Sequence, residues 1–301
     1  LLVLIAVVEC IAMVVGASLS QSLEQLFPDP GEAVGTTLRF AIGDGGPRVV
    51  PSRQGREVLP ETLAGAVLPV LGETGAARAV TVPLEVSEPE IDTATARSLG
   101  VKELVSEYTT YYPSDFAPRL TNIHRAAELM DDTPVLPGKV FSLNGTVGER
   151  TAERGFAAGY IINNGRLEVD YGGGVSQLAT TVFNAAFFAG LDIPSYYMHG
   201  IYIARYPYGR ESTISFPSPD VRIRNNTPYG VLIWPTYTGT SITVTMYSTK
   251  YVSGEQTNQT TEKKGVCTAV TTERTRTYVD GRKTTDRFTG LYSPEEGVKC
   301  E

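Results

Sequence analysis

The sharpest local signal in the chain is a run of three glycines leading into an apolar segment: Gly172, Gly173, Gly174, Val175, Ser176 and Gln177. Consecutive glycines let a backbone bend sharply and approach a ligand closely. If a helix starts after them, its free N–H groups and positive dipole end favour a carboxylate, a phosphate or a developing oxyanion. No lysine follows the glycines, so the segment is not a Walker A phosphate-binding loop.

Ser176 stands where the start of a helix can activate a nucleophile. A serine needs a general base, and the histidine available downstream is His199. His199 follows the expected helix after a short loop, and it reaches the helix start only if the strand-like segment 201–206 packs there. In the structural alternative, Ser176 caps the helix and His199 holds a loop.

The segment after His199 is rich in tyrosine and arginine. Arg205 and Arg210, with Tyr206 between them, could clamp a carboxylate and stack on a sugar or a peptide. In the alternative, one of these arginines pairs within the fold with an acidic residue such as Glu211. The sequence leaves both interpretations open.

Periodicity predicts the elements that must position these residues. Apolar spacing indicates helices over 121–131 and 177–189, and Gly190 stands where a helix-ending glycine belongs. Alternation predicts a strand over 221–224 and a strand pair over 229–237 and 241–248.

The N-terminal part reads as a separate small α+β module over residues 20–92. It is expected to contain a hairpin turning at 43–46, a helix over 59–71 and a strand over 80–86. Residues 93–115 and the polar stretch 251–265 are expected to be linkers.

Cys267 and Cys300 flank two strand-like segments, 268–278 and 282–292, separated by an Asp-Gly turn signal. A hairpin there would bring the two cysteines together at its open end. We therefore predict a disulfide, which indicates an oxidising, extracytoplasmic compartment. Neither a metal nor a cofactor is expected, because the two histidines and the remaining cysteine do not make a zinc ligand set.

Composition narrows the class of protein. The 301 residues carry a net charge of −7, and the first 110 hold 7 basic and 14 acidic side chains, which accounts for all of it. The acidic pI of about 5.1 argues against a nucleic-acid partner. Residues 1–17 are nearly all apolar, as in an export signal, a membrane anchor or a buried core helix.

Several separated motifs, in order, resemble the VanW family over about residues 105–250. They are Pro137-Gly138, Phe141 to Asn144, Gly148 to Thr151, Gly155-Phe156, Gly172 to Gln177, Thr180-Thr181, Asn184 to Ala186, His199 and Tyr206 to Glu211. Residues 20–92 resemble the peptidoglycan-binding module that commonly precedes VanW domains. The cysteine-flanked tail resembles the C-terminal extension of actinobacterial relatives.

The resemblance implies a bacterial cell-wall protein with a VanW-like domain over 116–250 and a disulfide-closed hairpin over 266–301. Many family members carry Cys at the position of Ser176, which implies acyl transfer in those members. A serine alkoxide is harder to form than a thiolate, so Ser176 marks either a non-catalytic branch or a Ser–His variant.

Three functions are considered, and the sequence favours the first, with the second as its alternative. The first is a cell-envelope protein, wall-associated or membrane-anchored, that binds peptidoglycan stem peptide or glycan. The second is a peptidoglycan transpeptidase or peptidase with Ser176 as nucleophile, His199 as base and the N–H groups of residues 174–177 as oxyanion donors. The third is a structural partner of other envelope proteins. The fold class is α+β, and the candidate ligand-binding residues are Gly172, Gly173, Gly174, Val175, Gln177, Thr180, Arg205, Tyr206, Arg210 and Glu211.

Overall fold

The computed structural model describes residues 38–75, 80–89, 91–163, 166–295, 298 and 300. The expectation for residues 1–17 lies outside the described residues. The chain divides into two compact units, one containing residues 49–98 and the other residues 99–301. No helix among the described residues is long and apolar enough to cross a membrane. Helices and sheets occur together, so the predicted α+β class is confirmed.

The described residues up to 98 form short elements, and residues 41–48 among them belong to the second unit. The predicted hairpin is present as β1 (Arg39–Gly43) and β2 (Gly46–Val50). The predicted helix is present as α3 (Pro60–Val67), continued by the 3₁₀ turn η1 (Leu68–Val70). The strand expected over 80–86 is mostly wrong, because only β4 (Glu85–Ser87) forms, paired with β3 (Gly55–Glu57).

The second unit is centred on a four-stranded antiparallel sheet in the order β5-β13-β12-β6. Its strands are β5 (Glu103–Tyr111), β13 (Ser241–Ser248), β12 (Val231–Tyr237) and β6 (Thr133–Val135). Helices α5 (Ala117–Met130) and α7 (Ser176–Phe188) pack against it. The two predicted helices and the predicted strand pair are thus confirmed, although α5 begins earlier, with Pro118 in its first turn.

The linker expected over 93–115 is wrong. Helix α4 (Thr93–Ser98) and β5 occupy it, and β5 is a full partner of β13. Two inward-facing residues of β5 are polar: Ser106 donates to the Ala185 carbonyl at 2.8 Å, and Thr110 shares a hydrogen bond with Thr181 at 2.7 Å. Because these inward-facing residues are polar, β5 lacks the alternation of apolar and polar residues from which a strand is predicted.

Smaller elements complete the second unit. A three-stranded sheet has the order β10-β11-β7, and a separate hairpin joins β8 to β9. The elements are β7 (Val140–Ser142), α6 (Leu143–Val147), β8 (Ala158–Asn163), β9 (Arg166–Tyr171), β10 (Asp192–Ser195) and β11 (Arg222–Arg224).

The C-terminal part is a three-stranded antiparallel sheet rather than a hairpin alone. Strands β15 (Cys267–Tyr278) and β16 (Lys283–Tyr292) form the predicted hairpin, and Cys267 is disulfide-bonded to Cys300 as predicted. The linker expected over 251–265 is wrong, because β14 (Val252–Lys264) pairs with β15 along its length. This edge strand is polar and largely exposed, so its composition resembles that of a loop.

The buried Arg274 of β15 joins this sheet to α7. Its guanidinium donates to the carbonyls of Phe187 at 3.0 Å and Leu191 at 2.9 Å, and its Nη2 lies 2.5 Å from a carboxylate oxygen of Asp286. These donors satisfy carbonyls that the helix end leaves free, where a cation is also favoured by the helix dipole. Gly254 lets β14 approach, because a Cβ there would lie 2.0 Å from the Phe187 carbonyl oxygen.

Replacing Arg274 with methionine should lower the free energy of unfolding by about 3 kcal/mol, the low end for breaking a buried ion pair. The low end applies because Asp286 keeps Arg276 as a partner at 3.0 Å. Urea unfolding measures the loss. The control is Arg287→Met, which removes an exposed ion pair with Glu273 and should cost less than about 1 kcal/mol. Equal losses in the two variants would contradict this role for Arg274.

Asp192 in β10 allows a pH-dependent test of the contact with the C-terminal sheet, because it forms an ion pair with Arg276 of β15. Burial raises the pKa of its carboxyl, but hydrogen bonds from Arg224 and Arg276 outweigh burial and leave the pKa below its ordinary value of 3.8. A carboxyl whose pKa is lower in the folded than in the unfolded state stabilises the folded protein at any pH above the unfolded-state pKa. This stabilisation is lost as the pH falls through the folded-state pKa. The stability advantage of the wild type over Asp192→Asn should therefore be constant from about pH 5 to 7 and shrink below about pH 4.

The measurement is urea unfolding of both proteins across this pH range, with the exposed Asp115→Asn variant as control. An advantage that grew on acidification would show that the arginines do not stabilise the Asp192 carboxylate.

Candidate functional site

Helix α7 carries Ser176 at its first position. The N-cap is Val175, without a side-chain cap, so the capping role considered for Ser176 is wrong. The Ser176 hydroxyl instead shares a hydrogen bond with the Thr213 hydroxyl at 3.1 Å and accepts one from the Ile214 N–H at 3.4 Å. Gly190 ends the helix as predicted, in the left-handed conformation with φ of 71°.

The glycine loop is shaped by close packing. Gly172 and Gly174 have φ values of 83° and 102°, in the left-handed region that disfavours other residues. A Cβ at Gly173 would lie 2.6 Å from the Tyr160 carbonyl oxygen of β8. Each glycine is thus required by the fold, whatever the loop binds.

Two of the four backbone donors expected for an oxyanion are already used inside the loop. The N–H of Val175 donates to the Gly172 carbonyl at 3.1 Å, and the N–H of Gln177 donates to the Gly174 carbonyl at 2.9 Å. An oxyanion at Ser176 would therefore depend on the remaining N–H groups of residues 174 and 176.

Gln177 and Thr180, both predicted to bind ligand, are fully buried and make contacts within the fold. The Gln177 side chain accepts a hydrogen bond from Arg119 at 2.6 Å. The Thr180 hydroxyl donates to the Ser212 carbonyl at 3.0 Å and accepts from the Ser212 N–H at 3.2 Å. Thr180 therefore fastens the segment that carries Glu211 and Thr213 against α7.

His199 is held by Glu211. The His199 backbone N–H donates to Glu211 Oε1 at 2.8 Å, and its Nδ1 makes a short ion-pair contact with Oε2. Both residues are buried, His199 at 8% exposure and Glu211 at 1%. Because a carboxylate only accepts hydrogen bonds, the contact places a proton on Nδ1, and in the neutral form of the ring the lone pair is then on Nε2.

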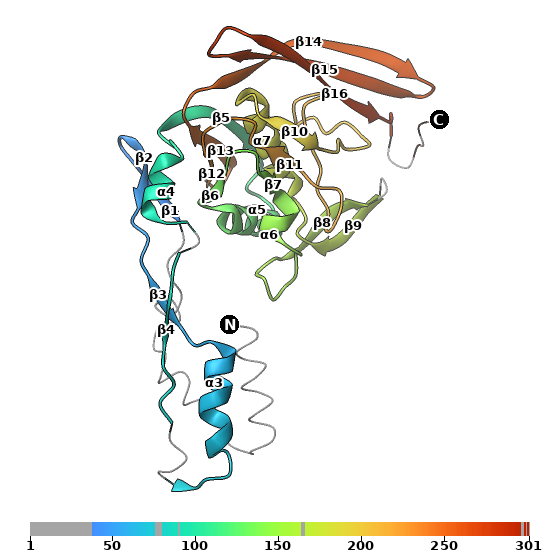
Figure 1. Cartoon of the computed structure of the whole chain (residues 1–301). Coiled ribbons are helices and arrows are strands. Elements are labelled where there is room, and N and C mark those ends of the chain that lie inside the picture. Colours follow the sequence, from blue (N-terminus) through green and yellow to red (C-terminus); the bar gives the residue numbers. More distant parts are fainter. Residues whose placement is uncertain are drawn as a thin grey trace. The chain divides into compact units, whose positions relative to one another are not determined.

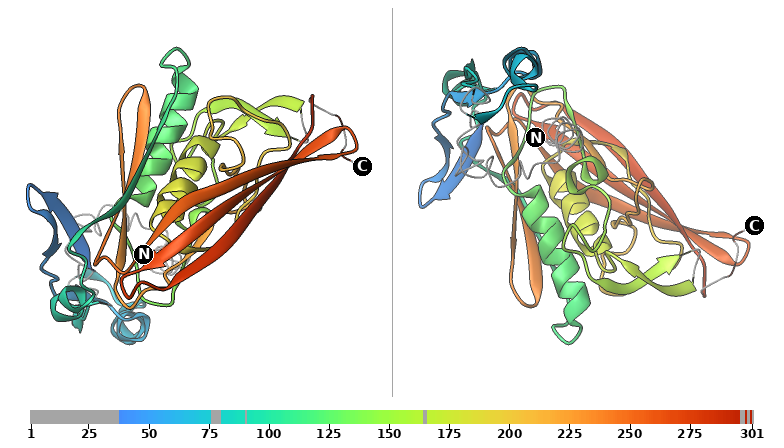
Figure 2. Two further views of the ribbon diagram at one scale, coloured as in Figure 1. Left: turned by 90° about the horizontal axis from the view of Figure 1, so that it is seen from above. Right: turned by 90° about the horizontal axis from the view of Figure 1, so that it is seen from below.

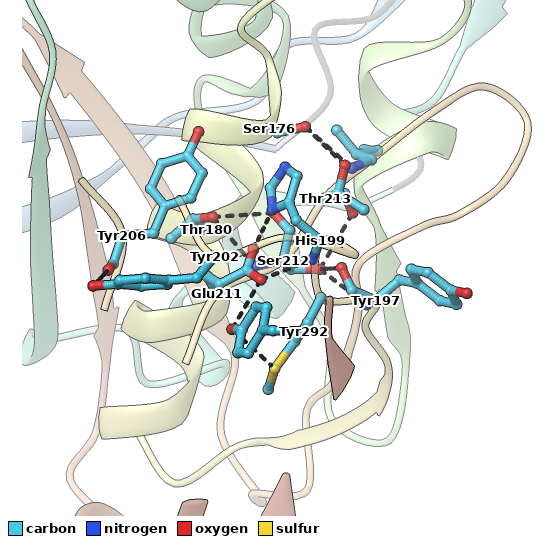
Figure 3. A network of polar contacts seen from close by, with 12 residues as sticks. Ser176, Thr180, Tyr197, His199, Tyr202, Tyr206, Glu211, Ser212, Thr213 and Tyr292 are labelled. Atoms are coloured by element: carbon cyan, nitrogen blue, oxygen red, sulfur yellow. Dashed lines mark hydrogen bonds and ion pairs between the residues drawn. The ribbon is translucent and has the colours of Figure 1, made fainter. Parts of the chain in front are cut away.

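Figure 3 shows the His199 ring between the Glu211 carboxylate and Ser176, with Nε2 on the side toward the serine. Among the described residues, no hydrogen bond joins His199 to Ser176, whose hydroxyl faces Thr213. Both residues belong to one polar network, because Ser176 bonds to Thr213 and the Thr213 N–H donates to the carbonyl of Tyr197, two residues before His199. The hydrogen bond between nucleophile and base that the sequence predicted is not formed.

Tyr292, at the end of β16, completes the environment of Glu211. Its hydroxyl donates to Glu211 Oε1 at 3.2 Å, and burial, with the nearby carboxylate, raises its pKa. Tyr292 is therefore a neutral donor at ordinary pH. Ser293 donates its N–H to the Gly200 carbonyl at 2.7 Å, so the C-terminal sheet is fastened directly beside His199.

The two arginines in the segment after His199 have different environments: Arg210 packs within the fold, and Arg205 is exposed. Arg210 stacks over the Phe188 ring at 4.9 Å and donates to Gln256 of β14 at 2.9 Å. Arg205 is exposed beside Tyr206, whose buried ring stacks on His199 with centroids 5.5 Å apart. Among the described residues, neither arginine forms an ion pair with Glu211, which pairs with His199 instead. The Arg–Glu211 pair that the sequence allowed is therefore wrong.

Sequence reasoning missed the role of Glu211 as the partner of His199, and it missed Thr213 and Tyr292 altogether. Glu211 follows His199 by 12 residues, with no periodic element between them that would predict contact. Tyr292 lies 81 residues beyond Glu211, and only the packing of β16 brings it there.

Comparison with known proteins places this site in a family. The sequence model described as VanW like protein matches residues 118–247. The Bacillus subtilis (strain 168) protein named "Uncharacterized protein YoaR" is 34% identical over 165 residues, which cover 55% of this chain and 54% of that protein. The chain thus spans about half the length of this curated relative. No solved structure matches the chain.

Residues 118–247 therefore resemble the VanW-like domain that the motifs predicted. Ser176, His199 and Glu211 lie inside the matched range, whereas Tyr292 lies beyond it. The residue that supports Glu211 from the C-terminal sheet is thus an addition to the matched domain.

Replacing Glu211 with glutamine should change the tautomer of His199. The amide supplies N–H donors where the carboxylate supplied acceptors, so Nδ1 is expected to become an acceptor and Nε2 to carry the proton. Long-range ¹H–¹⁵N spectra of the imidazole rings measure this exchange directly. His124, which stacks on Tyr237 at 4.0 Å, is the internal control because it is the only other histidine. Unchanged His199 nitrogen shifts would contradict the assigned role of Glu211.

Proposed function

We propose that the VanW-like domain acts on the peptide stems of peptidoglycan by acyl transfer, with Ser176 as nucleophile, His199 as base and Glu211 as the positioning residue. The observation that carries the proposal is the buried His199–Glu211 pair beside a serine at the first position of a helix. A histidine oriented by a carboxylate is the usual general base for a serine nucleophile.

In the proposed reaction, the Ser176 oxygen attacks a stem-peptide carbonyl while its proton passes to His199 Nε2. The amide C–N bond then breaks, and the departing amine takes that proton. The acyl group remains on Ser176 as an ester. A second amine or a water molecule, deprotonated by His199, attacks this ester and regenerates the serine. Glu211 stabilises the imidazolium through its contact with Nδ1.

The cellular setting is part of the proposal. The Cys267–Cys300 disulfide favours an oxidising compartment, and the VanW-like domain favours the cell envelope. We place the protein outside the cytoplasm, associated with the cell wall or held by a membrane anchor, with peptidoglycan as its partner. The N-terminal unit is proposed to help in binding the wall.

A second candidate is binding of the stem peptide without chemistry. It is favoured by the contacts that hold the Ser176 hydroxyl toward Thr213 and Ile214. It also agrees with the serine at position 176, where the resemblance to the VanW family implies the stronger nucleophile cysteine in many members.

Incubation with purified peptidoglycan and soluble stem peptides separates the two functions, with muropeptide masses as the measurement. The wild type should produce new masses that Ser176→Ala does not. His199→Gln should lower the rate by about 10²–10⁴, the usual contribution of a general base.

His124→Gln is the matched control and should keep the wild-type rate, because His124 contacts Tyr112 and Thr238 rather than the site. Binding with unchanged masses in the wild type, and new masses only in Ser176→Cys, would overturn acyl transfer by serine and support the binding function. No binding of either ligand would overturn both.

A further inference from the structure

A cavity of about 580 Å³ is lined by residues of the segment after His199 and of the C-terminal sheet, including Tyr292. We call it the tyrosine pocket, and the residues that matter to its chemistry are Tyr202, Tyr208, Tyr292, Lys263, Val266 and Thr268. The residues come from three separate parts of the chain, two of which belong to the C-terminal sheet.

The three tyrosine rings form one aromatic surface. Tyr208 stacks on Tyr292 with centroids 5.2 Å apart, and Tyr202 meets Tyr208 edge-on at 4.7 Å. Tyr292 is nearly buried, whereas Tyr202 is 43% exposed and Val266 is 57% exposed at the rim. Apolar ring surface of this kind is favourably covered by another apolar face.

Polar groups surround the aromatic surface. Lys263 reaches the Thr268 hydroxyl at 3.2 Å, which uses one of the three donors of its ammonium group. An occupant must therefore offer an apolar face to the rings and oxygen acceptors at its edge. A pyranose ring has both, because its C–H bonds gather on one face and its hydroxyl and acetamido oxygens lie around the rim.

We propose that the tyrosine pocket binds a pyranose ring of the glycan strand that carries the peptide stem. The proposal rests on the proposed function for its choice of peptidoglycan. The position supports it, because Tyr292 lines the pocket and also donates its hydroxyl to Glu211 at 3.2 Å. Sugar and peptide sites would then be separated by a single side chain, as a stem joined to a sugar requires.

The test uses the full chain with Ser176→Ala, so that ligands bind without reaction. Isothermal titration calorimetry compares a disaccharide-tetrapeptide with the free tetrapeptide. The disaccharide-tetrapeptide should bind about fivefold more tightly, because stacking of one ring is worth about 1 kcal/mol. Adding Tyr202→Ala should reduce this preference to less than about threefold, and Lys263→Gln, an exposed change with little effect on folding, should reduce it partly.

Tyr237→Ala is the matched control, because Tyr237 is also 40% exposed but lies in β12 beside His124. It should keep the full preference. Equal affinity for the two ligands in the parent, binding of neither, or a full preference retained in both Tyr202→Ala and Lys263→Gln would overturn the sugar site. The two proposals can fail separately. If the glycan preference depends on Tyr202 but the wild type produces no new muropeptide masses, the sugar site is supported and the acyl-transfer proposal is refuted. New masses without any glycan preference would do the reverse.

Discussion

The second unit depends on the complete burial of a helix that carries several polar side chains. Every residue of α7 from Gln177 to Phe187 is buried, including Thr180, Thr181 and Asn184. A buried polar group without a partner is costly, so each of these side chains constrains a neighbour. Thr181 fixes β5, Thr180 fixes the Ser212 segment, and Asn184 donates to the Arg210 carbonyl at 2.9 Å.

The site follows from that constraint. Side chains of α7 hydrogen-bond to the backbone of Arg210 and Ser212. These bonds fix the orientation of Glu211, which in turn holds His199. The opposite end of the helix is satisfied by Arg274, which brings the C-terminal sheet and therefore Tyr292 into place. One helix thus positions the serine at its start and, through its buried polar contacts, the groups that surround the serine.

Much of this organisation could be predicted from the sequence, and the failures have physical causes. The glycine loop, α7 with its terminal glycine, and the Cys267–Cys300 pairing all depend on local signals. Strands β5 and β14 were missed because one buries serine and threonine against α7 and the other is a polar edge. The His199–Glu211 contact and the approach of Tyr292 depend on tertiary packing, for which no local pattern exists.

A fluorophosphonate probe reacts with activated serines, so it tests directly the proposal that His199 activates Ser176 as a nucleophile. With the labelled peptide identified by mass spectrometry, we expect one adduct on Ser176, formed much more slowly in His199→Gln and at an unchanged rate in His124→Gln. An absence of labelling at Ser176, or labelling at the same rate in His199→Gln, would contradict it.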